Sequence, residues 1–161
     1  MGKGTVQDGS ATEDDGVDDN ASVIDELTGL GNRRGFLEIL RMEERRHARY
    51  GGIPILVLID VRKVLAERPL VERGDLLVEI AGVLADCIRD TDTLARVDED
   101  RFAILAIQAG CSSSSIIGRL RLHLELRRIH QAEVSAWESG SLTEAWQAID
   151  GPSRPTLRLV Q

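Results

Sequence analysis

Two apolar segments separated by only three residues constrain the fold of this chain more than any other feature. Thr93 to Val97 and Arg101 to Ile107 each have the length and composition of a β-strand, and the acidic tripeptide Asp98-Glu99-Asp100 joins them. This spacing predicts a β-hairpin. Because helical and strand patterns alternate before and after the hairpin, we expect an α/β sandwich with a mixed central sheet rather than a purely parallel one.

The rest of the chain supplies single helices and strands around this hairpin. Apolar spacing predicts helices at residues 35–50, at about 75–88, from the serines 112–115 onward and at 142–149, and strands at 53–59, 132–137 and 156–160. Cys87 lies on the apolar stripe of the second helix, so we expect it in the core. Together, these elements predict a sheet of about five strands plus the short hairpin, flanked by helices.

The first 20 residues differ from the rest in composition. They carry six acids and one lysine and have no apolar periodicity. This composition predicts a disordered acidic tail, although a cloning remnant or the end of a linker would have the same composition. Hydrophobic residues make up 42% of the chain, which is enough for one core, so we expect residues 21–161 to form one domain.

Several classes of protein are disfavoured by composition. The longest apolar stretch, residues 53–59, is too short to span a bilayer, and the N-terminus has no apolar signal region, so we expect a cytoplasmic protein that does not enter a membrane. A net charge of −7 with 3% aromatic residues argues against nucleic-acid binding. The only lysines are Lys3 and Lys63, so the domain must bind phosphate through arginine or backbone groups.

No other residue pattern indicates a metal, a cofactor or a nucleophile. The three histidines lack ligand spacing, and the serines at 112–115 near Cys111 have no base beside them, so helix capping is the simpler interpretation. The acids Asp98, Glu99 and Asp100 fit a solvated turn better than a weak cation site. We therefore expect no bound metal and no cofactor.

A series of motifs along the chain resembles a known family. Residues 25–34 read DELTGLGNRR, followed by a strand ending at Asp60, a Gly74-Asp75 pair, an Arg89-x-x-Asp92 motif, and RVDEDRFAIL at 96–105. This order resembles the GGDEF (diguanylate cyclase) family over roughly residues 22–160, whose signature at the last position is RYGGDEFAIL. The resemblance implies a sandwich like the palm of nucleotide cyclases. It also implies an activity, the condensation of two GTP molecules into cyclic di-GMP by two metal ions in a dimer.

The positions that carry this activity in the family are altered here. Asp60 and Asp100 match its metal-binding acids, but Arg62 and Arg101 stand where it has two further acids. Cations at these places oppose a metal ion. Asp98 and Glu99 replace the two glycines of the turn, which adds bulk and negative charge where a triphosphate would lie.

The substrate-binding segment is altered as well. Asp75 matches a guanine-reading position, but the segment 61–73 is shorter than in the family and lacks the asparagine that reads guanine with it. The family's late phosphate-binding lysine is absent, because no lysine follows Lys63. We therefore expect a degenerate domain that is not an enzyme and has no catalytic residue.

A second family site is retained. The Arg89-x-x-Asp92 motif matches an inhibitory site that binds cyclic di-GMP as a stacked dimer, and the helper arginine of that site corresponds to Arg119 or, with a shifted alignment, to Arg121. An arginine fork suits phosphate or the O6/N7 edge of guanine, and a carboxylate can accept from guanine N1–H and N2–H. The alternative is structural: Arg89 could complement a helix dipole and pair with Asp92 on the surface.

Three hypotheses follow for the function. The first is an inactive GGDEF domain that acts as a cyclic di-GMP receptor through Arg89, Asp92 and Arg119 and signals to an unknown protein partner. The second is an interaction scaffold that binds no nucleotide and uses the fold to form a homodimer. The third is a pseudo-enzyme that binds GTP as an allosteric effector, for which Asp60, Asp75 and Asp100 are the remaining argument.

Overall fold

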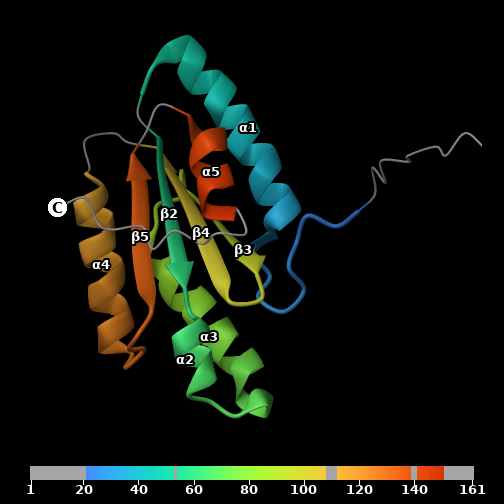
Figure 1. Ribbon diagram of the computed structural model, residues 1–161, viewed down its shortest axis with the longest axis vertical. Helices are drawn as coiled ribbons and strands as arrows, with labels where there is room; N and C mark the ends of the chain where they lie inside the picture. The colour runs from blue at the N-terminus through green and yellow to red at the C-terminus, as the bar shows by residue number, and fades with distance from the viewer. Residues whose placement is uncertain (1–20, 53, 108–111, 139–140, 151–161) are drawn as a thin grey trace, which may run out of the picture.

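A mixed five-stranded sheet forms the centre of the computed structural model, which describes residues 21–52, 54–107, 112–138 and 141–150. The strand order is β1-β3-β4-β2-β5 (Figure 1). β1 runs parallel to β3 and the other pairs are antiparallel, so the expected mixed sheet is confirmed, with both hairpin strands among its five. The strands are β1 (Gly31–Asn32), β2 (Pro54–Asp60), β3 (Thr93–Asp98), β4 (Arg101–Ile107) and β5 (Glu133–Glu138).

Helices cover both faces of this sheet (Figure 1). α1 and α5 pack on one face, and α3 and α4 pack on the other. The helices are α1 (Arg33–Tyr50), α2 (Arg62–Ala66), α3 (Leu70–Cys87), α4 (Ser113–Leu126) and α5 (Leu142–Asp150). The arrangement is the α/β sandwich that the sequence predicts.

β2 is buried on both faces, which explains its unbroken apolar run. Successive side chains of a strand point to opposite faces. Ile55, Val57 and Ile59 accordingly join the core under α3 and α4, while Leu56 and Leu58 join the core under α1 and α5. Cys87 is only 4% exposed in the first of these cores, as expected.

Some boundaries differ from the sequence prediction. α3 begins at Leu70 rather than near residue 75, and Pro69 occupies its N-terminal cap position. The sequence did not predict this first turn because Leu70 and Val71 point into solvent and do not extend the apolar stripe of the helix. The short α2 and β1 were not predicted. The acidic tail at 1–20 and the strand predicted at 156–160 lie outside the described residues. No helix in the described part combines the length and the apolar character needed to cross a membrane.

Candidate functional site

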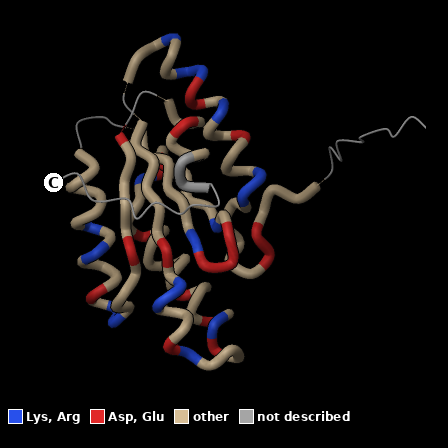
Figure 2. The backbone as a smooth tube through the Cα atoms, in the orientation of Figure 1, with Lys and Arg blue, Asp and Glu red and all other residues tan. Residues whose placement is uncertain are grey.

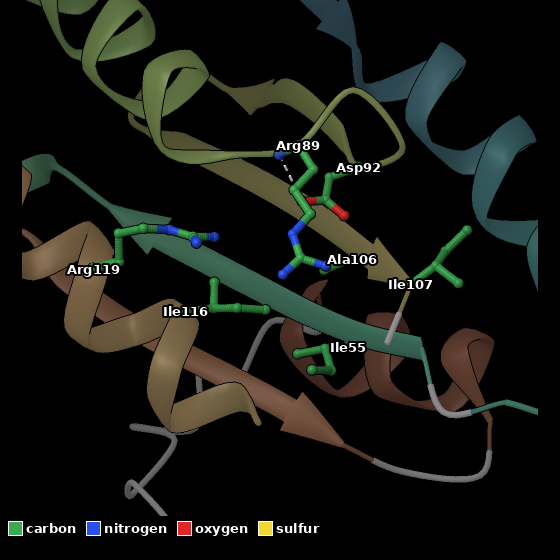
Figure 3. Close-up of a pocket in the computed structure, with 7 residues that line it drawn as sticks. All are labelled: Ile55, Arg89, Asp92, Ala106, Ile107, Ile116 and Arg119. Carbon is green, nitrogen blue, oxygen red and sulfur yellow. Dashed lines mark hydrogen bonds between the residues drawn. The ribbon is translucent and has the colours of Figure 1, made fainter. Parts of the chain in front are cut away.

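Arg89, Asp92 and Arg119 line one small hollow on the α3–α4 side of the sheet (Figure 3). Arg89 and Asp92 lie in the turn between α3 and β3, and Arg119 comes from α4. Both arginine side chains extend toward the same space, and the Asp92 carboxylate lies beside Arg89. The hollow has a volume of about 10 Å³, close to that of one water molecule. Its apolar walls are Ile55, Ala106, Ile107 and Ile116.

Local hydrogen bonds fix the turn that carries the motif. The backbone N–H of Arg89 donates to Asp92 Oδ2 at 2.9 Å, and the backbone N–H of Asp92 donates to the carbonyl of Arg89 at 2.9 Å. The three-residue separation of Arg89 and Asp92 therefore lets them close a hydrogen-bonded turn. The first of these bonds fixes the direction of the Asp92 side chain before any ligand binds.

The structure also separates the two candidate helper arginines. Arg119 lines the hollow, where its Nε atom is buried and has no hydrogen-bond partner among the described residues. Arg121 is exposed, and its Nη2 atom lies 3.5 Å from the carbonyl of Val134 on β5. Arg119 is therefore the arginine that the fold brings to Arg89 and Asp92.

The residues that the resemblance matches to the family's metal-binding positions and signature turn gather at the other end of β2, near the tip of the β3–β4 hairpin. Figure 2 shows acidic and basic positions side by side there. Arg62 binds the carboxylate of Asp60: its Nε atom lies 3.1 and 3.0 Å from the two oxygens, and its Nη2 atom lies 2.6 Å from Oδ2. The same Nε atom is 3.7 Å from Asp100 Oδ2.

Arg101 makes a second ion pair at the hairpin tip. Its side chain is buried, and its Nη2 atom donates to Asp98 Oδ2 at 2.8 Å, which holds the pKa of Asp98 below its usual value. Burial raises the pKa of Asp100, as do the neighbouring charges of Asp60 and Asp98, against the opposing effect of the arginines. Glu99 is exposed, and its carbonyl accepts from Arg96.

A divalent ion does not fit these side chains as they stand. Hard cations need carboxylate oxygens with free lone pairs, and Arg62 engages both oxygens of Asp60 while approaching Asp100. No group of three metal-binding side chains occurs in the part of the chain that the structure describes. Asp75, which the resemblance matches to a guanine-reading position, lies exposed on α3 and lines neither the hollow nor the hairpin-tip cluster.

The two clusters are well separated. Pro54 pairs with Ile107 at the end of β2 that borders the hollow, and Asp60 pairs with Arg101 at the opposite end. The five steps from Ile55 to Asp60 span about 17 Å at about 3.4 Å per residue. The clusters therefore lie at opposite ends of one strand and share no side chain.

Sequence reasoning missed the apolar walls of the hollow. These residues come from β2, β4 and α4, and their approach to Arg89 depends on the sheet order rather than on any local pattern. A usable signal was the helical spacing of Ile116 and Arg119, which places both on one side of α4.

Comparison with known proteins assigns the family. The model of the family described as "Diguanylate cyclase, GGDEF domain" matches residues 22–136. No match was found among curated proteins.

Solved structures share the fold. The diguanylate cyclase SiaD from Pseudomonas aeruginosa, in complex with its activator SiaC, is 29% identical with a TM-score of 0.61, and the match covers 72% of this chain and 48% of SiaD. DgcB from Caulobacter crescentus, solved with c-di-GMP, is 19% identical with a TM-score of 0.64, covering 80% of this chain and 76% of that one. LapD from Vibrio cholerae, bound to c-di-GMP, is 18% identical with a TM-score of 0.62, covering 79% and 32%.

This chain thus spans about half of the SiaD chain that it matches. The family match covers most of the present sequence, and the mixed sheet with its hairpin agrees with it. The chain belongs to the GGDEF domain family.

Proposed function

We propose that this domain is a catalytically inactive GGDEF domain that acts as a cyclic di-GMP receptor in the cytoplasm and signals to a protein partner. The observation that carries the proposal is the meeting of Arg89 and Asp92, from the turn between α3 and β3, with Arg119, from α4, in one hollow. Ligand recognition needs only this cluster, which lies apart from the altered catalytic face.

The chemistry of the hollow suits the ligand. Each phosphate of cyclic di-GMP carries a negative charge, and a guanidinium group binds phosphate or the O6/N7 edge of guanine through paired hydrogen bonds. Asp92 can accept from the N1–H and N2–H groups of guanine, while Ile107 and Ile116 offer apolar surface to the base. Because the hollow itself is small, the ligand must lie over it, against the side chains of Arg89, Asp92 and Arg119.

The altered catalytic face supports the inactive half of the proposal. Arg62 pairs with Asp60, and Arg101 Nε lies 4.0 Å from Asp100, so both arginines oppose metal binding at the two carboxylates that a metal-dependent cyclase would need for its ions. Two structural neighbours, LapD and DgcB, were solved in complex with c-di-GMP, and SiaD was solved in complex with its activator SiaC. Cyclic di-GMP is therefore the first ligand to test, and a search for a protein partner follows.

Calorimetry with cyclic di-GMP tests the proposal. We expect micromolar affinity, which corresponds to about 8 kcal/mol, and two ligands per chain if the ligand binds as a stacked dimer. Arg89→Ala, Asp92→Ala and Arg119→Ala should each cost about 2–3 kcal/mol, roughly a hundredfold, because each removes a hydrogen bond to a charged group. Their melting temperatures should stay near that of the wild type.

Arg121→Ala is the matched control, since it removes the same charge from the same helix but outside the hollow. It should leave the affinity nearly unchanged. An equal loss in Arg121→Ala and Arg119→Ala would mean that general charge, not the hollow, attracts the ligand. Absence of heat with wild-type protein at high micromolar ligand would refute the receptor, and the homodimer scaffold would then be the leading hypothesis.

A further inference from the structure

At the hairpin tip, the guanidinium group of Arg62 lies next to the carboxylates of Asp60 and Asp100 and balances their negative charge. We propose that Arg62 is a built-in cation that holds the hairpin tip to the start of α2 in place of a divalent ion, and that removing its guanidinium group opens a divalent-cation site at Asp60 and Asp100. The distances carry the first half of this proposal: Arg62 contacts Asp60 at 2.6–3.1 Å and lies 3.7 Å from Asp100.

The backbone, and not Arg62 alone, brings the two carboxylates together. Asp60 pairs with Arg101 in the β2–β4 register, and the backbone N–H of Val61 donates to the carbonyl of Asp100 at 2.9 Å. These bonds remain when the side chain of Arg62 is shortened. The carboxylates of Asp60 and Asp100 would then stay close together without the charge that now lies between them.

The charge balance favours a divalent ion in that state. Asp60, Asp98 and Asp100 supply three negative charges and Arg101 supplies one positive charge, so these four side chains have a net charge of −2 without Arg62. Arg33 also acts on this cluster, but through Asp98. Arg101 is held by its 2.8 Å bond to Asp98. Lys63, the next cation along the chain, pairs with Glu133 instead.

The part-buried position strengthens the effect. The side chains of Asp60 and Asp100 are 15% and 22% exposed, so water screens their repulsion incompletely. Oxygen ligands of this type bind Mg²⁺, Mn²⁺ and Ca²⁺. Two carboxylates that lose an arginine between them therefore favour a hard cation in its place.

Thermal melting of the full chain tests the proposal, with Arg62→Ala as the variant. In EDTA, Arg62→Ala should melt several degrees below the wild type. Mg²⁺, Mn²⁺ or Ca²⁺ at millimolar concentration should recover most of that loss, since binding to the folded state alone stabilises it. The wild type should not respond to these ions. Direct titration of Mn²⁺ followed by electron paramagnetic resonance should detect a bound ion only in the variant.

Two controls separate a cation site from a general charge effect. Lys63→Ala removes the neighbouring exposed cation and should show no response to divalent ions. Arg62→Ala combined with Asp60→Asn should lose the response, because one ligand is gone. If Arg62→Ala does not fold, Arg62→Gln takes its place in the same measurements. Equal responses of wild type and variant, or a folded variant that binds no Mn²⁺ in EPR, would overturn the proposal.

Discussion

The carboxylate of Glu138, at the end of β5, accepts a 2.7 Å hydrogen bond from the backbone N–H of Ser113, the first residue of α4. The Ser112 side chain, which occupies the cap position of this helix, makes no capping bond. Glu138 also pairs in the sheet with Ile55, which lines the hollow, and Ser113 lies one helical turn before Ile116, which lines it too. This bond therefore ties the helix that carries Arg119 to the sheet beneath the proposed ligand site.

Glu138→Ala should loosen this connection. We expect a loss of about 0.5 kcal/mol in the free energy of unfolding, at the low end for a helix cap because Glu138 is exposed. Affinity for cyclic di-GMP should fall a few-fold, since Arg119 is held less firmly. Calorimetry and urea denaturation measure the two effects, and Glu138→Gln, which keeps an acceptor, should lie between variant and wild type. Unchanged affinity in Glu138→Ala would show that the cap does not position Arg119.

Arg96→Ala should destabilise the domain and change its response to acid. Arg96 joins distant segments, donating to Asp25 at 3.1 Å and to the carbonyl of Glu99 at 2.9 Å, so its loss should cost about 2 kcal/mol at pH 7. Burial alone would raise the pKa of Asp25, but hydrogen bonds from Thr28 and the charge of Arg96 lower it below its usual value.

The sign of the pH effect follows from that direction. A lowered pKa in the folded state means that Asp25 contributes stability above its unfolded pKa of about 3.9 and loses it as the pH falls through the lowered value. The difference between wild type and Arg96→Ala in urea denaturation should therefore shrink as the pH falls from 5 toward 2. A difference that stays constant over this range would contradict the assignment of the ion pair.

The purified protein should not convert GTP into cyclic di-GMP with Mg²⁺ or Mn²⁺. Combining Asp98→Gly, Glu99→Gly and Arg101→Glu should not restore the activity, because Arg62 still binds Asp60. Separation of the nucleotides by liquid chromatography measures the product. Product above a blank without enzyme, and dependent on Asp100, would disprove the expectation.

Deleting residues 1–20 should change the melting temperature little, because a Gly- and Asp-rich segment without apolar periodicity buries almost no apolar area. Differential scanning calorimetry of the full and shortened chains makes the comparison. A drop of many degrees would mean that the segment packs on the domain.

The hairpin could be predicted closely from sequence because its information is local. The acids at 98–100 interrupt two apolar segments, and the observed strands differ from the prediction by at most one residue at each end. The first turn of α3 could not be predicted, because Leu70 is 77% and Val71 is 88% exposed and neither follows the apolar stripe. β1 is too short to have a pattern of its own, since its two residues are a strand through pairing with distant Ala95 and Arg96.

The candidate site also contains residues that the sequence could predict and residues that only the fold reveals. Arg89 and Asp92 form a motif within one turn, so sequence alone could find them. The choice between Arg119 and Arg121 depends on which side of α4 faces the sheet, and the apolar walls depend on which strands are neighbours. The bond between Arg62 and Asp60 forms where a strand passes into a short helix that the sequence did not predict.

The central position of β2 has a consequence for how such a domain can change over generations. One end of the strand borders the hollow and the other ends in Asp60, and a fully packed core separates them. Substitutions at the hairpin tip can therefore accumulate without moving a side chain at Arg89, and the reverse also holds. A lineage can therefore keep the residues at one end of the strand while those at the other end diverge, because the two clusters are attached to the same scaffold at points that do not touch.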